Sequence, residues 1–543
     1  MILYKKYLTI ITGISLVFCS CYNSTTSKKN IFHYNEQTGI ASIDPAFAKN
    51  QSVMWAVHQM YNTLVETDSL LQLVPSLAKR WALSEDKKTY TFSLRNDVFF
   101  QDDACFSRGV GRKMTARDVV YSFKRITDPE TASPGAWVFN GKVNSINGLV
   151  AINDTTFQLK LARPYYPILG ILSMQYCSIV AHEAVEKYGN EFRRHAVGTG
   201  PFQFVAWEEG QALVLKKNQN YFEKDKSGSR LPYLDGIKIS FFDSKATEFL
   251  LFRQGKLDFI NDIDPSFKDE ILTKGGNLRK EWEHKIQLQK HPYLNIEYLG
   301  IMVDTTNMLV SSSPFRLKKI RQAINYGFDR KKMILYLRNS IGTPASSGFI
   351  PSGLPSFDSA EVKGYNYNPE LSKKLIKEAG YSRNNMPKIT LLTISTYADF
   401  ASYIARQLEE TGFNIQVETV QKSLLFDLTA NAKALFFRGS WIADYPDAEN
   451  YLSVFYSKNP SPPNYTRYKN KVFDSLFEKA IAESNDSLRY ILYRKADQQM
   501  ISDAPVVPLW YDEVLRIVQP YVKGFQPNAL NLLELKYVHF DKH

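Results

Sequence analysis

The sequence predicts an α/β protein that folds as two or three domains. Alternating apolar residues typical of strands are followed by segments with helical apolar spacing, first within 89–126 and again within 388–420. The second region reads as strand, helix, strand, which favours a parallel pair of strands. A chain of 543 residues is also too long for a single hydrophobic core.

The N-terminus has the pattern of a bacterial export signal. Two lysines precede an apolar run over 7–18 that is too short to span a bilayer as a mature helix. The run ends in Phe18-Cys19-Ser20-Cys21, which resembles the lipobox of bacterial lipoproteins, and the segment after it is polar. We expect removal of 1–20, a lipid on Cys21 and a tether over 21–31. An ordinary signal peptide cut nearby is the alternative.

The composition argues against several classes of function. The formal net charge is +12, but charges of both signs are interspersed and no long basic block indicates nucleic-acid binding. The eight histidines are scattered, and His182-Glu183 lacks the second histidine of a zinc helix, so we expect no metal and no cofactor. The mature chain contains no GxSxG elbow and no Walker loop. Cys105 and Cys177 are either a disulfide or two buried free thiols.

In chain order, the first element with clear signals is a strand followed by a helix. Tyr90, Phe92 and Leu94 alternate onto one face, as in a half-buried strand. Thr115 and Asp118 have the spacing of a capping box before an apolar helical pattern. We therefore expect a strand near 89–94 and a helix that begins after Thr115.

The middle of the chain predicts further strands and helices. Strands are expected within 198–222 and 231–243, followed by a helix over 245–260. Another strand is expected within 292–303, and the apolar spacing over 315–337 predicts a helix of several turns.

The next helix has the clearest local signals. Asn368 is an N-cap residue with Pro369 at the first helical position, and Gly380 is the stop signal. The strand, helix, strand unit within 388–420 comes next.

The stretch "GSWIADYPDAENYL", from Gly439 to Leu452, places a carboxylate among aromatic residues. Asp444 before Tyr445-Pro446 is compatible with a simple turn, because Asp commonly initiates turns. The alternative is that Asp444 binds a cation from outside the protein. Asp447 and Glu449 are expected to be solvated loop acids.

Five quoted regions carry a resemblance over almost the whole mature chain. They are "SIDPAFAKNQSVMWAVHQMYNTLVETD", "LAKRWALSEDKKTYTFSLRNDVFF" with "TARDVVYSFKRI", "VGTGPFQFVAWEEG" with "LPYLDGIKI", "ADYPDAENYL" and "APVVPLWY". In this order they resemble the extracellular solute-binding proteins of family 5, the oligopeptide, dipeptide and nickel-type receptors of ABC importers. The insert over 102–113 is longer than the common pattern of that family.

The resemblance implies a bilobed periplasmic-binding-protein fold of the large three-domain type. Domain I of the first lobe would comprise 32–72, 196–288 and 515–543. Domain II, inserted into that lobe, would comprise 73–195. Domain III, the second lobe with Asp444, would comprise 289–514. The lobes would close over a ligand like a hinge.

The resemblance also implies roles for eight residues. Asp444 would pair with the free α-amino group of a peptide, and Trp441 would form the wall of a side-chain pocket, unless it is simply part of the core. Ser440 and Ile442 would offer backbone groups for strand pairing. Arg438 would help to hold the C-terminal carboxylate, or would only balance an acid. Asn50 and Gln51, with Lys49 beside them, would make backbone contacts from the other lobe.

The function implied is a receptor that is not an enzyme. It would capture short peptides outside the cytoplasmic membrane and deliver them to a permease with ATPase subunits. We expect a monomer that faces the periplasm, is attached to a bacterial membrane only through its lipid and does not bind nucleic acid. The alternatives are the same fold binding a nickel chelate, haem, glutathione or a glycoside, a lipid-anchored hydrolase, and an anchored signalling or adhesion protein.

Overall fold

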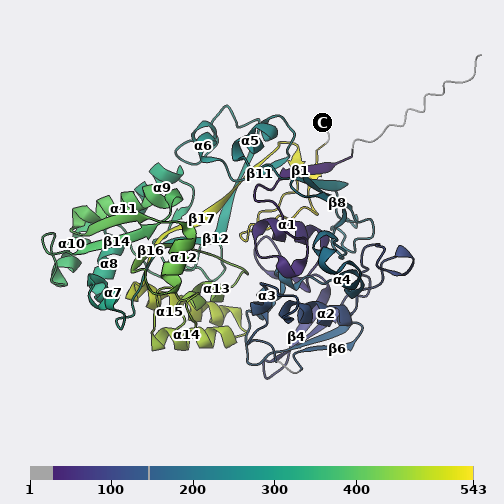
Figure 1. The fold of residues 1–543 in the computed structure, drawn as a ribbon, viewed down its shortest axis with the longest axis horizontal. Coiled ribbons are helices and arrows are strands. Elements are labelled where there is room, and N and C mark those ends of the chain that lie inside the picture. The colour runs from purple at the N-terminus through teal and green to yellow at the C-terminus, as the bar shows by residue number, and fades with distance from the viewer. Residues whose placement is uncertain (1–28, 145–146, 542–543) are drawn as a thin grey trace, which may run out of the picture.

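The computed structural model describes residues 29–144 and 147–541, which form two lobes (Figure 1). In Figure 1 the first lobe, largely purple and blue, lies to the right, and the second lobe, largely green, lies to the left. The mixture of helices and strands confirms the predicted α/β class. The predicted signal peptide, Cys21 and most of the predicted tether lie outside the described residues.

One large mixed sheet runs through both lobes. In the described part of the chain it has eleven strands, and β13 (Thr343–Pro344) pairs with β17 beside the main path. The order along that path is β15 (Asn414–Thr419), β14 (Lys388–Thr393), β16 (Phe436–Ile442), β12 (Gln287–Ile301), β17 (Val506–Val518), β11 (Phe259–Asn261), β1 (Ile31–Asn35), β10 (Gly236–Ser240), β9 (Ala212–Lys217) and β8 (Phe202–Glu208).

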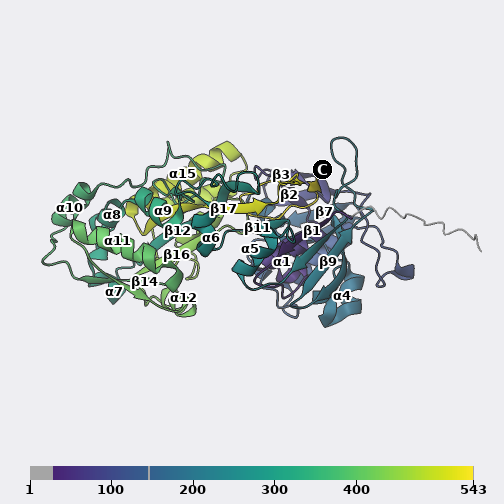
Figure 2. The same ribbon diagram turned by 90° about the horizontal axis from the view of Figure 1, so that it is seen from above.

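The two long antiparallel strands β12 and β17 join the lobes. Their register runs from Gln287 opposite Val518 to Gly300 opposite Val506. β16 pairs with the second half of β12, whereas β11 pairs with the end of β17. Figure 2 shows β17 passing from the second lobe toward β11 in the first. The domain limits expected at 288/289 and 514/515 therefore fall inside two continuous strands.

A separate antiparallel sheet of four strands forms the lower part of the first lobe in Figure 1. Tyr90, Phe92 and Leu94 are all buried, which confirms the predicted strand face. Thr115 and Asp118 form the predicted capping box at the start of α2 (Ala116–Thr127). The strands are β4 (Ala78–Leu83), β5 (Thr89–Leu94), β7 (Thr156–Lys160) and β6 (Leu149–Asn153).

The second lobe confirms two further predictions. The side chain of Asn368 accepts from the backbone N–H of Leu371 and caps α10 (Pro369–Glu378). The chain reverses at Gly380, which has a φ of 84° that favours glycine. β14 and β15 are parallel and are connected by α11 (Ala398–Thr411).

Two predicted helices are shorter than their apolar spacing indicates. The segment 315–337 forms two helices, α8 (Lys318–Tyr326) and α9 (Arg330–Arg338), because Asp329 caps a new helix by accepting from the N–H of Lys332. The segment 245–260 forms only α5 (Lys245–Arg253) and then enters β11. Pairing of β11 with β1 and β17 outweighs the local helical pattern.

The remaining elements complete the two lobes. None of the helices in the described residues has the length and apolar character needed to cross a bilayer. The thiols of Cys105 and Cys177 are free. The other helices and strands are α1 (Gln51–Met60), α3 (Ile168–Leu172), α4 (His182–Tyr188), α6 (Pro265–Ile271), α7 (Met308–Ser311), α12 (Lys422–Ala430), α13 (Glu449–Leu452), α14 (Lys471–Ala482), α15 (Asp486–Asp503), β2 (Val65–Thr67), β3 (Leu73–Pro75), β18 (Val522–Lys523) and β19 (His539–Phe540).

Candidate functional site

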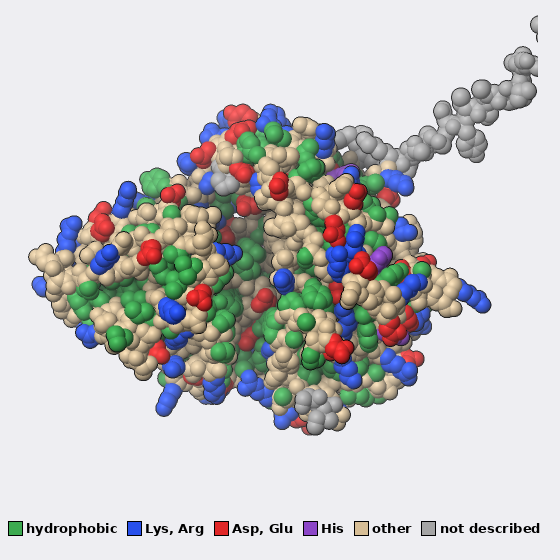
Figure 3. Space-filling model, viewed as in Figure 1, with side chains coloured by type: hydrophobic (Ala, Val, Ile, Leu, Met, Phe, Trp, Pro, Cys, Tyr) green, Lys and Arg blue, Asp and Glu red, His purple; other side chains and the backbone are tan. Residues whose placement is uncertain are grey.

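Asp444 lies just beyond the end of β16, where the two lobes approach each other. The N–H of Ala443 donates to the carbonyl of Leu294 on β12 at 2.9 Å, and the chain then turns. The Asp444 side chain is exposed, whereas Tyr445 is buried. The Tyr445 ring lies against Gly170 of α3 in the first lobe. A Cβ atom added to Gly170 would lie 3.5 Å from this ring. Figure 3 shows a hollow between the lobes with acidic side chains in it.

A buried asparagine orients both Asp444 and Trp441. Nε1 of Trp441 donates to Oδ1 of Asn450 at 2.9 Å, and Nδ2 of Asn450 donates to Oδ2 of Asp444 at 3.3 Å. Trp441 is therefore half-buried and hydrogen-bonded. Its ring is neither fully enclosed in the core nor fully exposed to solvent. Sequence reasoning missed Asn450, because an asparagine in a polar stretch has no distinguishing local signal.

The carboxylate of Asp444 has no cationic partner in the protein. Among the described residues, no Lys, Arg or His nitrogen lies within 4.0 Å of it. Although water reaches the side chain, the surrounding protein raises its pKa above the usual range, and the Asn450 hydrogen bond offsets this only in part. The pKa of Tyr176, in the first lobe, is raised mainly by burial and to a lesser extent by the negative charge of Asp444. The site therefore favours an incoming cation.

Next to Asp444, one edge of β16 is open. β14 pairs with β16 only at Phe436 and Phe437, so the edge of 438–442 extends past the end of β14. The backbone N–H of Ala443 donates to β12, and in an antiparallel strand the backbone N–H and C=O groups of every second residue point to the same side. The N–H and C=O groups of Arg438, Ser440 and Ile442 therefore point away from β12, toward the open edge. Ser440 and Ile442 are the two residues that the family resemblance associates with backbone pairing.

Arg438 is already paired inside the protein. Its Nη2 lies 2.6 Å from Oε2 of Glu297 on β12, and the two side chains are 11% and 3% exposed. The guanidinium carbon lies 3.8 Å from the ring centroid of Tyr397, whose hydroxyl donates to Glu297 Oε1 at 3.1 Å. Burial raises the pKa of Glu297, and Arg438 acts in the opposite direction. The acid that Arg438 balances is thus a buried glutamate.

Asp447 and Glu449 are buried, so the prediction that they are solvated loop acids is wrong. The hydroxyl of Tyr445 donates to Glu449, and a nitrogen of Arg489 lies 3.6 Å from Asp447. Burial raises the pKa of Glu449 to about 7. The loop turns inward because it packs against the first lobe, where the Tyr165 hydroxyl lies 3.5 Å from that of Tyr445.

Asn50 and Gln51 belong to the first lobe and have clear structural roles. Asn50 caps α1 by accepting from the N–H of Val53 at 3.2 Å, and Gln51 is the first residue of that helix. Lys49 and Asn50 line a cavity of about 930 Å³ between the start of α1 and α2. No hydrogen bond or ion pair joins either Asn50 or Gln51 to the group around Asp444 in the described part of the chain.

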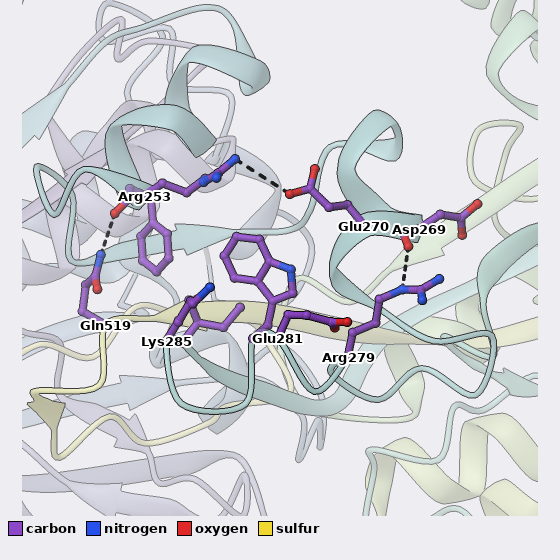
Figure 4. Close-up of a pocket in the computed structure, with 10 residues that line it drawn as sticks. Arg253, Asp269, Glu270, Arg279, Glu281, Lys285 and Gln519 are labelled. Carbon is purple, nitrogen blue, oxygen red and sulfur yellow. Dashed lines mark hydrogen bonds and ion pairs between the residues drawn. The ribbon is translucent and has the colours of Figure 1, made fainter.

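A second cavity, of about 780 Å³, lies in the first lobe among α5, α6 and the loop that leads to β12. Figure 4 shows Arg253 pointing toward Glu270, and the two groups approach to 3.8 Å. Arg279 Nε donates to the Asp269 carbonyl at 2.8 Å. Both acidic and basic side chains line this cavity. The described residues also contain no group of three or more metal-binding side chains.

Comparison with known proteins gives a consistent result. A family model described as "Bacterial extracellular solute-binding proteins, family 5 Middle" matches residues 72–463. The periplasmic oligopeptide-binding protein OppA of Salmonella typhimurium is 26% identical, with 94% of this chain and 92% of that protein covered. Heme-binding protein A of Haemophilus influenzae is 27% identical, with 96% of each covered.

The fold also matches solved structures. One is the ABC transporter-associated periplasmic binding protein DppA from Helicobacter pylori in complex with the peptide STSA. It is 25% identical, with a TM-score of 0.73, and the match covers 94% of this chain and 98% of that one. This likeness confirms the bilobed fold that the sequence resemblance implies.

Proposed function

The chain belongs to the bacterial extracellular solute-binding proteins of family 5, and from that premise we propose that it is the peptide-binding receptor of an ABC importer. In this role it captures short peptides outside the cytoplasmic membrane and passes them to a permease with ATPase subunits. The relatives named for oligopeptide binding and the complex with a tetrapeptide support this ligand class.

One observation carries the proposal: within the described part of the chain, the carboxylate at the end of the open strand edge has no cationic partner. A free peptide amine is largely protonated near neutral pH, since its pKa is about 7.7 to 8.0. Asp444 supplies the opposite charge, and its raised pKa is expected to fall once a cation binds beside it. The open edge at 438–442 pairs with any extended backbone, so the receptor tolerates many peptide sequences.

The proposal includes no enzymatic step and no cofactor. Asp444 and Asn450 bind and orient a ligand, and nothing in their chemistry requires a reaction. We further propose a monomer that is divided into the three domains described above, faces the periplasm and is attached through a lipid on Cys21. Relatives described as periplasmic support that location.

The second candidate is a receptor of the same fold for haem or glutathione. The relatives named for heme and for glutathione binding favour it as strongly by identity as the oligopeptide-binding relatives favour peptides. The site itself favours peptides over haem, because an open strand edge suits an extended backbone and not a planar macrocycle.

The experiment is mass spectrometry of the small molecules that copurify with the protein and are released by denaturation. The unmodified protein is compared with Asp444→Ala and with Asp399→Ala, which removes an exposed acid on α11. We expect short peptides with free N-termini in the unmodified and Asp399→Ala samples and a strong loss in Asp444→Ala. Peptides in equal amount in all three would contradict the role of Asp444, whereas a single non-peptide mass would favour the second candidate.

A further inference from the structure

We propose that the second cavity, among α5, α6 and the loop that leads to β12, is a binding site for a small zwitterion with an apolar side chain, such as a free amino acid. The cavity shares no residue with the group around Asp444, because its lining comes from the segment 252–286 and from Gln519, all in the first lobe. The inference therefore does not depend on the proposed peptide-binding function.

Four buried side chains line the cavity. Phe252, Trp282 and Ile286 are 1%, 8% and 4% exposed, and Gln519 is 9% exposed. Nε2 of Gln519 donates to the carbonyl of Phe252 at 2.7 Å and to that of Leu257 at 3.2 Å. Both N–H groups of this amide are thus occupied, so its remaining polar atom, Oε1, is an acceptor. The buried part of the lining offers apolar contact and an acceptor in a fixed orientation.

Two basic side chains of the lining are held beside the ring of Trp282. The guanidinium carbon of Arg253 lies 5.5 Å from the ring centroid, and Nζ of Lys285 lies 5.6 Å from it. Arg253 also approaches Glu270 to 3.8 Å. In contrast, no carboxylate oxygen of the described residues lies within 4.0 Å of Lys285 Nζ. The ring therefore positions an ammonium group whose charge the protein does not match.

The acidic side chains of the lining include one that is free. Asp269 accepts from Lys274 Nζ at 3.1 Å and from Asn339 Nδ2 at 2.7 Å. For Glu281, the described part of the chain places no Lys, Arg or His nitrogen within 4.0 Å of the carboxylate. Figure 4 shows Glu281 and Lys285 along the same side of the cavity. A free carboxylate and a free ammonium group thus line one side of the cavity without pairing.

This arrangement favours a ligand that carries both signs of charge. The lining balances three basic with three acidic side chains, so a ligand with a net charge of either sign gains little from it. A zwitterion offers its carboxylate to Lys285 and its ammonium group to Glu281. Its apolar side chain contacts Trp282. The volume of about 780 Å³ lies within the range of small-molecule pockets.

The test is isothermal titration calorimetry near neutral pH with three probes. L-Phenylalanine carries both charges, phenylacetate carries only the carboxylate, and 2-phenylethylamine carries only the ammonium group. All titrations use Asp444→Ala, which removes the carboxylate at the open strand edge as a second partner for an amine. Into this protein we introduce Glu281→Gln or Lys285→Met. The matched controls are Glu283→Gln and Lys280→Met, which remove exposed charges of the same loop that do not line the cavity.

L-Phenylalanine is expected to bind at least about fivefold more tightly than either singly charged probe. Glu281→Gln and Lys285→Met should each weaken its binding about threefold to fivefold, whereas the two controls should leave it unchanged. Absence of phenylalanine binding would overturn the inference, and so would equal binding by both cavity variants and both controls. Equally tight binding of phenylacetate would also overturn it, because the cavity would then be an anion site. None of these results bears on the peptides that copurify with the protein, which test the proposed function separately.

Discussion

Nδ2 of Asn450 lies 3.3 Å from Oδ2 of Asp444, and this single hydrogen bond is the only one from a protein side chain to that carboxylate in the described part of the chain. The same amide accepts from Trp441, so one buried side chain sets the positions of both. Asp444 is therefore oriented but not neutralised, which is the state that a receptor for a cationic group requires.

Replacing Asn450 by Ala is expected to weaken peptide binding and to lower the free energy of unfolding by about 1 to 3 kcal/mol, because Trp441 and Asp444 both lose a buried partner. Peptide titration and urea unfolding measure the two effects. Asn431→Ala, on an exposed turn, is the control. Unchanged binding in Asn450→Ala would show that Asp444 does not need this orientation.

Replacing Ser440 by Pro tests the open edge. The N–H of Ser440 points away from β12, so proline removes a donor to the ligand without removing a hydrogen bond of the sheet. We expect weaker peptide binding with little change in thermal stability. Ser440→Ala, which keeps the N–H and removes only the hydroxyl, should bind normally. Equal binding by Ser440→Pro and Ser440→Ala would mean that the ligand does not pair with this strand.

Replacing Glu297 by Gln is expected to cost roughly 3 to 5 kcal/mol of stability, because the buried guanidinium of Arg438 loses its counter-charge. The double variant Glu297→Met with Arg438→Met should be more stable than the Glu297→Met single variant, since it leaves no unpaired charge. Urea unfolding of the unmodified protein, Glu297→Met, Arg438→Met and the double variant gives the coupling energy. A cost below about 0.5 kcal/mol for Glu297→Gln would contradict the pairing.

The stability of the protein should depend on pH through Glu449. Burial raises the pKa of Glu449 to about 7 in the folded protein, from an ordinary value near 4.5 in the unfolded chain. The contribution of Glu449 to the free energy of unfolding is therefore full below the unfolded-state pKa and is lost as the pH rises through about 7. The expected difference between pH 5 and pH 8 is at most roughly 3 kcal/mol. The ionisable groups that face it are Tyr445, Asp447, Tyr165 and Lys142.

Glu449→Gln removes the ionisation and keeps a group of similar size. Urea unfolding at pH 5 and pH 8 should show that the unmodified protein loses more stability over this interval than Glu449→Gln does. Glu483→Gln, at a position with partial exposure, is the control and should behave like the unmodified protein. An identical pH dependence in all three proteins would mean that Glu449 does not titrate in this range.

The sequence by itself determined the features that depend on neighbours a few residues apart. Asn368 before Pro369 and Thr115 with Asp118 mark helix starts that the structure reproduces. The alternation of Tyr90, Phe92 and Leu94 likewise marks a strand face. The family was also identified from the sequence, because several motifs occur along this chain in the same order as in the family.

The tertiary structure alone decided which charges are free. Arg438 meets Glu297 across 141 residues, and Glu449 is buried because the first lobe packs over its loop. Burial and pairing depend on segments that are distant in the sequence and are brought together by the sheet. A local pattern therefore cannot distinguish the free carboxylate of Asp444 from the buried one of Glu449.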